Sequence, residues 1–374
     1  MNIVLKRALL IFIAVPLAVP LYATELTING TYLGSVNGIK PHNSRLKNQF
    51  DYAANVDINV AINPKVAGVI QFQMSPGGGS LGFPGDQIVV TDLNLSYFAD
   101  RVPFEITMGS FDTPFGQQVV RLSNNADTFN NMLILNPLLY SAFAGPMGTL
   151  NTLGIMTTYR ALYGQATLAI TNGTDESAHN PDGRFGVVGR LISIPLLNNS
   201  MIIGASYMQS DDHQGDETDS SGFKADFSAG MLDFSLKLID QLHLNAYIAR
   251  LVYGDQQSAT VDEVWSWMTE TAYQWQKFRL SARISGWQPR GTGTNDINYS
   301  SEDSSLTGNV PNPGFANTGT VKLDQDIYRY ELGVAYSFTP AITIRSEIFW
   351  DDYRDDSIRN TDVLGALALV NVRF

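Results

Sequence analysis

The residues of this chain that could do chemistry are few, and their spacing does not assemble a catalytic or metal-binding site. The chain has 374 residues, no cysteine and four histidines. The histidines are His42, His179, His213 and His243. No two of them have the spacing of metal ligands on a strand, and no Gly-x-Ser-x-Gly elbow is present. His213 follows Asp211 and Asp212 in an acidic, solvated run, which leaves a Ser/His/Asp hydrolase open as an alternative. We expect no catalytic residue, no metal and no cofactor.

Charged side chains occur instead at alternate positions of otherwise apolar segments. The basic candidates are Arg184, Arg190, Arg279, Arg283, Arg329 and Arg345. The acidic candidates are Asp57, Asp92, Glu105, Asp226, Glu331 and Glu347. If these positions line one enclosed space, bases on one wall facing acids on another would create a transverse field across a pore. The alternative is that the charges pair with each other, because a wet interior needs polar side chains in any case.

Strands must position these charges, because the dominant pattern along the chain has a period of two. From Phe50 to Ile62, apolar and aromatic residues occupy the even positions, and Asp51, Asn55, Asp57 and Asn59 occupy odd ones. Such runs exceed the roughly 5–6 residues usual for globular strands and match the ~9–11 needed to cross a membrane. One face of each strand is therefore expected to meet lipid and the other water.

The connections between these strands alternate in length. Short ones lie near 63–64, 99–103, 160–162, 195–199, 240–241, 275–277 and 339–340, and long polar ones near 38–49, 75–87, 112–150, 173–183, 210–221, 255–260, 289–326 and 353–361. Short turns at one rim and long loops at the other are typical of outer-membrane barrels. The pattern predicts an all-β, transmembrane antiparallel barrel of sixteen strands, with a bulge near Met231, where the apolar parity shifts.

The two ends of the chain fit this architecture. Lys6 and Arg7 precede an apolar run from Ala8 to Val19, and Ala23 offers a small residue for cleavage, which predicts a signal peptide at 1–23 and a barrel at 24–374. The last strand ends in Phe374 and is expected to pair with the first strand around Leu26 to Tyr32, because lipid excludes an open sheet edge. The net charge of −12 argues against a nucleic-acid partner.

Aromatic residues cluster near the expected strand ends, which predicts two interfacial girdles. The clusters are Tyr97 with Phe98, Tyr159 with Tyr163, Trp265 with Trp267, Tyr273 with Trp275, Tyr336 with Phe338, and Phe349 with Trp350.

The third long loop, at about 112–150, is the most informative segment for function. It has no clear strand but contains apolar residues such as Leu133, Leu135 and Leu138, so it is expected to pack against something. A sixteen-stranded barrel leaves a wide lumen into which it can fold. The candidates for the pore constriction are Asp112, Arg121, Asp127 and Glu105. An outward cap and a contact between subunits are the alternatives.

The sixteen-strand count with a long third loop resembles the trimeric general porins, and the segment from Gly109 to Gly116 looks like the strand-to-loop segment of the phosphate-selective porin superfamily. The terminal Phe374 is similar to the signal read by the barrel-assembly machinery. The resemblance implies a homotrimer, a constricting third loop and a Gly-rich second loop (76–82) that reaches a neighbouring subunit. The arginine ladders and lysine clusters of the anion-selective members are absent from this sequence.

We therefore expect an outer-membrane porin that passes small hydrophilic solutes and ions by diffusion. Its expected partners are outer-membrane lipid, periplasmic chaperones and lipopolysaccharide, whose phosphates the acidic runs 211–219 and 351–356 could bridge through Ca²⁺ or Mg²⁺. A channel specific for an anion, dicarboxylate or sugar and a non-conducting adhesin barrel are the alternatives.

Overall fold

The structure is a computed structural model. It describes residues 25–41, 47–75, 87–99, 102–116, 151–172, 185–193, 196–197, 200–212, 225–254, 261–290, 298–299, 321–322, 326–354 and 363–373. None of these residues belongs to a helix with the length and hydrophobicity of a membrane span. The expected signal peptide, most of the third loop and Phe374 lie outside the described residues.

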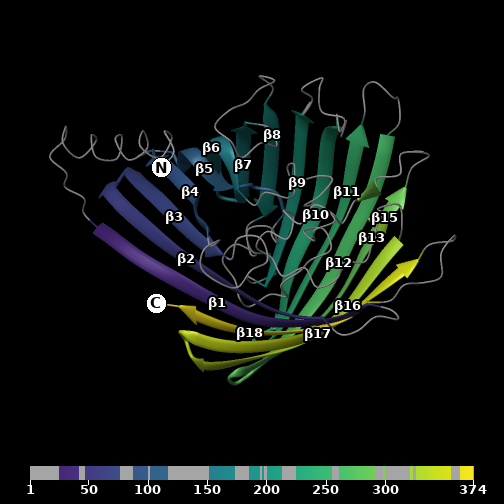
Figure 1. Ribbon diagram of the computed structural model, residues 1–374. Coiled ribbons are helices and arrows are strands. Elements are labelled where there is room, and N and C mark those ends of the chain that lie inside the picture. The colour runs from purple at the N-terminus through teal and green to yellow at the C-terminus, as the bar shows by residue number, and fades with distance from the viewer. Residues whose placement is uncertain are drawn as a thin grey trace.

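Sixteen of the described strands form one closed antiparallel barrel, as the sequence predicts (Figure 1). They are β1 (Glu25–Pro41), β2 (Lys47–Asn63), β3 (Val66–Ser75), β4 (Gln87–Phe98), β5 (Phe104–Asp112), β6 (Asn151–Ala161), β7 (Gly164–Thr171), β8 (Gly186–Ser193), β9 (Met201–Asp212), β10 (Ala225–Ile239), β11 (Leu242–Gly254), β12 (Val261–Trp275), β13 (Phe278–Arg290), β16 (Asp326–Thr339), β17 (Ile342–Arg354) and β18 (Val363–Arg373). The short β14 (Asn298–Tyr299) and β15 (Val321–Lys322) pair separately, so β13 pairs directly with β16.

The barrel closes between its first and last strands, but in a different register from the expected one. β1 and β18 pair from Thr31 opposite Arg373 to Pro41 opposite Val363, so of the expected Leu26–Tyr32 segment only Thr31 and Tyr32 face β18. The first residues of β1, from Glu25 to Gly30, pair with β2 alone among the described strands. Strands of a barrel are tilted and staggered, so the longer first strand extends past the end of the last one.

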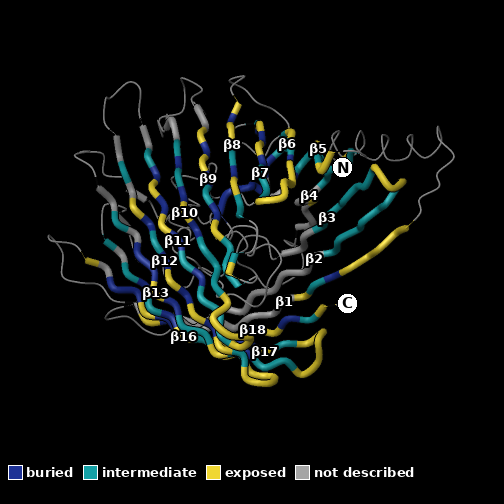
Figure 2. Tube along the Cα trace, turned by 180° about the vertical axis from the view of Figure 1, so that it is seen from behind, coloured by how far each residue is buried: buried dark blue, intermediate teal, exposed yellow. Residues whose placement is uncertain are grey.

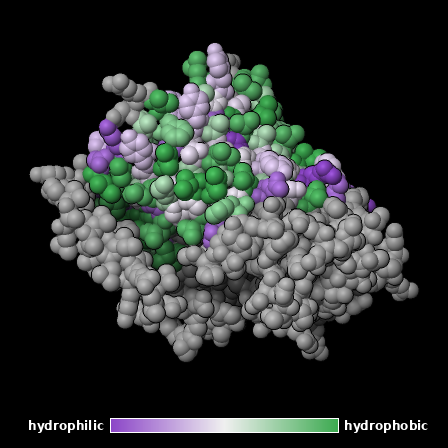
Figure 3. All heavy atoms as spheres, turned by 90° about the horizontal axis from the view of Figure 1, so that it is seen from above, coloured by the Kyte–Doolittle hydropathy of each residue, from purple (hydrophilic) through white to green (hydrophobic). Residues whose placement is uncertain are grey.

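Burial alternates along the strands and separates an inner face from an outer one (Figure 2). On β12, Ser266, Met268 and Glu270 are buried, whereas the intervening Thr269 and the neighbouring Thr271 are exposed. The outer positions carry large apolar side chains that are 60% exposed at Leu232 and 58% exposed at Leu332. In Figure 3, hydrophobic residues form large groups on the described surface. An apolar surface of this extent is unsuited to water and matches the lipid face of a membrane barrel.

The expected bulge near Met231 is wrong. β10 pairs with β9 without interruption from Ala225 to Leu236, and its irregularity against β11 lies between Lys237 and Ile239. Ala229, Met231 and Asp233 are all buried on the inner face, whereas Leu232 is exposed on the outer face. Because β10 carries apolar residues on both faces, its sequence looks as if the apolar positions changed from odd to even, although the strand is regular there.

Aromatic side chains form two outer rows, one near each rim of the barrel. Near the rim with the short turns, ring centroids lie 4.8 Å apart for Phe278 and Tyr336 and 4.7 Å apart for Tyr336 and Phe338. Near the other rim, Tyr330 stacks on Trp350 at 5.3 Å. Phe349 was expected in a girdle but faces inward and is 4% exposed, because its position on β17 has the opposite parity to Trp350.

Candidate functional site

The inner face of the barrel carries the charged residues, and its first cluster links β8, β9 and β10. Arg190 makes two hydrogen bonds of 2.9 Å with the carboxylate of Asp233, which lies two strands away. Both side chains are at least 96% buried. The strand between them passes at Gly204, where an added Cβ would lie 2.7 Å from both Arg190 Nη2 and the Asp233 oxygens. A side chain at residue 204 would therefore force this ion pair to shift.

A second and larger set of charges lies on β12, β13, β16 and β17, and we call these strands the charged wall. Arg283 binds Glu331, with 2.6 Å between Nη2 and Oε1, and its Nη1 lies 4.0 Å from Glu270. Arg329 binds Asp351 through two hydrogen bonds of 2.6 and 2.7 Å. All five of these residues are at least 96% buried. The nearby pair Arg345 and Glu347 is joined at 2.6 Å.

Opposite in character is the inner face of β4 to β7, which we call the hydroxyl wall. Ser96 and Thr107 are 2.8 Å apart through their hydroxyl oxygens, and Thr158 and Thr167 are 3.3 Å apart. Its described ion pair, between Arg160 and Glu105 at 2.7 Å, is half open to solvent at the short-turn rim. Among the described side chains of this wall, hydrogen bonds between neutral groups therefore outnumber ion pairs.

The first residues of the third loop lie against the inner face of the barrel. Thr113 is 3% exposed and Phe115 is fully buried. The backbone N–H of Gly116 donates to Ser206 Oγ at 3.0 Å, and Ser206 is an inner-face residue of β9. Because β6, β7 and β8 separate β5 from β9 in the sheet, the segment must pass over their inner faces to reach Ser206.

Two glycines permit this path. Gly109 has a φ of 118° and Gly116 a φ of 69°, a region that favours glycine. A Cβ at Gly109 would also lie 2.1 Å from the carbonyl oxygen of Leu93 on β4. The Gly109–Gly116 segment resembles a known strand-to-loop element, and its backbone conformation favours glycine at both of its ends.

The structure places the predicted residues as follows. Arg190, Arg283, Arg329, Arg345, Glu331 and Glu347 are buried on the inner face, and Arg279 and Asp57 are half-buried there. Asp57 accepts a hydrogen bond of 2.7 Å from Gln71. Glu105 lies at the end of β5 opposite to the third loop. The side chains of Asp92, Asp112 and Asp226 are not described, and Arg121, Asp127 and Arg184 lie outside the described residues.

Three buried carboxylates of the inner face and the hydroxyl that receives the loop were not predicted from the sequence. Asp351 was assigned to an outer acidic run, although the alternation of Arg345, Glu347 and Phe349 continues into it. Asp233 was hidden by the supposed bulge near Met231, and Glu270 lies between apolar inner-face residues. Nothing in the sequence singles out Ser206. Within the described ranges, no group of three or more His, Cys, Asp or Glu residues is arranged to hold a metal ion.

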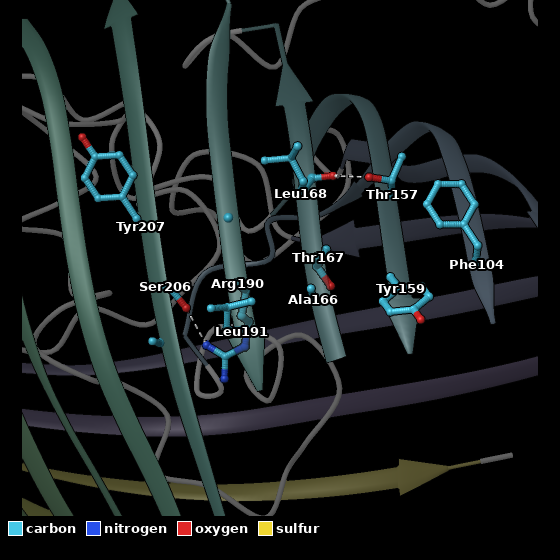
Figure 4. A pocket seen from close by; sticks show the side chains of 12 residues that line it. Phe104, Thr157, Tyr159, Ala166, Thr167, Leu168, Arg190, Leu191, Ser206 and Tyr207 are labelled. Atoms are coloured by element: carbon cyan, nitrogen blue, oxygen red, sulfur yellow. Dashed lines mark hydrogen bonds between the residues drawn. The ribbon is translucent and has the colours of Figure 1, made fainter. Parts of the chain in front are cut away.

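An apolar groove lies on the outer face of the barrel, behind the strand that bears Arg190. The groove has a volume of about 540 Å³ and lies over β5 to β9, with Phe104, Tyr159, Leu168, Leu191 and Tyr207 among its lining residues (Figure 4). Figure 4 shows Arg190 and Ser206 turned toward each other, joined by their hydrogen bond of 2.7 Å. Since its apolar lining residues have the parity of the outer face, the groove does not belong to the interior.

Comparison with known proteins identifies the architecture. No family model and no curated protein matches the chain. Among solved structures, the chain is similar to the outer membrane channel DcaP of Acinetobacter baumannii, with a TM-score of 0.61, 11% identity and coverage of 94% of this chain and 97% of that one. It is also similar to OprB of Pseudomonas putida, with a TM-score of 0.63, 12% identity and coverage of 95% and 96%.

A third similar structure is the trimer form of OmpT, an outer membrane protein of Vibrio cholerae, with a TM-score of 0.57, 12% identity and coverage of 93% of this chain and 99% of that one. At such identities the likeness concerns the fold. The chain therefore has the closed antiparallel sixteen-stranded barrel that is also found in outer-membrane channels.

Proposed function

We propose that this protein is an outer-membrane porin through which small hydrophilic solutes and ions diffuse passively. The observation that carries the proposal is the polarity of the closed barrel, with ion pairs and hydroxyls inside and large apolar side chains outside. Barrels of about 16–18 strands enclose an aqueous channel when the interior is polar. Transport by diffusion needs no catalytic step, so the function does not depend on a nucleophile or a metal.

We further propose that the third loop narrows this channel. The support is the described start of the loop, where Phe115 is buried and Gly116 binds Ser206 on the inner face of β9. Asp112, Arg121 and Asp127 would then lie near the narrowest part. Because each described arginine cluster on the inner face includes carboxylates, the geometry favours a general channel over one selective for phosphate.

The same proposal covers export and assembly. The segment 1–23 would be cleaved as a signal peptide, and the barrel would be carried by periplasmic chaperones to the assembly machinery. The apolar outer face would contact lipid and the membrane-embedded part of lipopolysaccharide, and three copies would form a homotrimer. The trimer form of a similar structure supports this assembly.

Planar-bilayer recordings of the folded protein without residues 1–23 test the function. We expect stepwise conductance increases in groups of three, and reversal potentials measured in a salt gradient would give the ion selectivity. A protein that is folded by circular dichroism and by its heat-dependent migration on gels, but leaves the bilayer silent, would overturn the channel proposal.

A further inference from the structure

We propose that Arg190, Asp233 and Ser206 form a latch that holds the start of the third loop against the barrel wall, and that Gly204 makes room for it. The inference rests on the proposed function, because it assigns these residues the task of positioning the loop that narrows the channel. They would be positioning residues, since none of them needs to touch a solute.

The hydroxyl of Ser206 is the point at which the wall meets the loop. Its oxygen accepts a hydrogen bond of 2.7 Å from Arg190 Nη1 and another of 3.0 Å from the backbone N–H of Gly116. A serine oxygen has two lone pairs, so these two donors use its full accepting capacity. The loop therefore contributes a backbone group, the N–H of Gly116, to this contact.

The guanidinium of Arg190 is in turn held by Asp233. The two hydrogen bonds of 2.9 Å fix the plane of the guanidinium, and one of its nitrogens serves both Asp233 and Ser206. A bidentate pair of this kind adds geometric specificity to its energy. Since both charges are buried, losing either partner would leave the other without compensation. Asp233 on β10 thus acts on the loop through two intermediates.

Gly204 leaves room for the latch. The ion pair crosses β9 directly over this residue, and any Cβ there would approach the Arg190 and Asp233 side chains to 2.7 Å. An alanine at residue 204 would push the Arg190 and Asp233 side chains aside and so disturb the hydrogen bond from Arg190 to Ser206. Glycine thus leaves free the space that the ion pair occupies.

Burial of the loop segment provides a readout that does not depend on conductance. Phe115 is 0% exposed and Thr113 is 3% exposed next to the latch. The chain has no cysteine, so a cysteine introduced at either residue is the sole thiol. Its reaction with a membrane-impermeant maleimide then reports how often the segment leaves the wall.

The experiment compares Phe115→Cys with Phe115→Cys combined with Ser206→Ala, Asp233→Asn or Gly204→Ala, all folded in lipid bilayers. We expect the maleimide reaction to be about tenfold faster in each combined variant. This corresponds to a decrease of about 1.4 kcal/mol in the free energy that holds the segment against the wall. Ser266→Ala is the matched control, because Ser266 is also a buried inner-face serine, on β12 and away from the latch, and its substitution should leave the rate unchanged. Thr113→Cys repeats the series in case Phe115→Cys does not fold.

Conductance measured on Ser206→Ala and Asp233→Asn in the cysteine-free background completes the test. We expect larger and noisier single-channel currents in both variants and wild-type currents in Ser266→Ala. Unchanged maleimide rates in all three latch variants would overturn the latch. If the rates rise while every variant, including the parent, is silent in bilayers, the latch stands and the channel function falls.

Discussion

The charged wall and the hydroxyl wall face the same interior but satisfy their polar groups by different physics. On the charged wall, Arg283 and Arg329 are buried against carboxylates of neighbouring strands. On the hydroxyl wall, Thr158 and Thr167 share a neutral hydrogen bond. A buried charge that loses its partner costs several kcal/mol, whereas a neutral hydroxyl pair contributes about 1 kcal/mol. Both walls are polar, but we therefore expect substitutions to cost more stability on the charged wall than on the hydroxyl wall.

The charges of the charged wall also balance locally. Among the described side chains, four arginines and four carboxylates occupy its inner positions: Arg279, Arg283, Arg329, Arg345, Glu270, Glu331, Glu347 and Asp351. Among them, Arg283, Arg329 and Arg345 make ion pairs within the same wall. The electric field of these ion pairs is thus directed largely along the wall. A basic wall facing an acidic wall would instead direct the field across the pore.

The largest expected effect is the removal of Arg283. Arg283→Leu leaves Glu331 and Glu270 buried without the guanidinium that lies against both, and we expect the free energy of unfolding to fall by about 3–5 kcal/mol. Denaturant unfolding of the barrel in lipid vesicles measures it. Leu251→Ala, which truncates a fully buried inner-face residue of β11, controls for lost packing. If a second substitution, Glu331→Leu, does not restore part of the stability, ion pairing does not explain the loss.

Neutralising Asp351 should combine a smaller loss of stability with a change of selectivity. Asp351→Asn keeps the shape but leaves the charge of Arg329 uncompensated, so we expect a loss of about 1.5–3 kcal/mol and a reversal potential shifted toward anions. Arg329→Gln is the matched opposite and should shift it toward cations. Shifts of the same sign for both variants would contradict an electrostatic origin.

The difference between the walls also marks the limit of what the sequence predicts. Alternation and loop lengths predict sixteen strands and the inner positions of Arg283, Glu331 and Glu347, because a period of two depends only on local geometry. The partners depend on register, which the sequence does not reveal. Asp233 was missed because apolar residues on both faces of β10 disguised its parity. The contact between Gly116 and Ser206 joins the loop that follows β5 to β9, four strands away in the sheet.

A glycine substitution tests whether the packing around the charged wall is as tight as its ion pairs require. Gly365 on β18 faces inward, where an added Cβ would lie 1.9 Å from the ring of Phe349, over which the guanidinium of Arg329 lies at 4.9 Å. Gly365→Ala should therefore cost about 1–3 kcal/mol by overpacking. Gly189→Ala is the control, because no atom lies within 4 Å of a Cβ there. Equal stabilities of the two variants would mean that Phe349 moves aside freely.

The smallest effect is expected on the hydroxyl wall. The double variant Thr158→Val/Thr167→Val removes both members of a buried hydrogen bond of 3.3 Å and replaces them with residues of the same shape. No charge loses its partner, and the half-buried amide of Gln165, which donates to Thr167 Oγ1 at 3.3 Å, loses only a neutral hydrogen bond. We therefore expect a change of at most about 1 kcal/mol in unfolding free energy and an unchanged reversal potential. The single variant Thr158→Val should be less stable than the double variant, since it leaves the hydroxyl of Thr167 buried without this partner. A double variant that loses as much stability as Arg283→Leu would remove the distinction between the two walls.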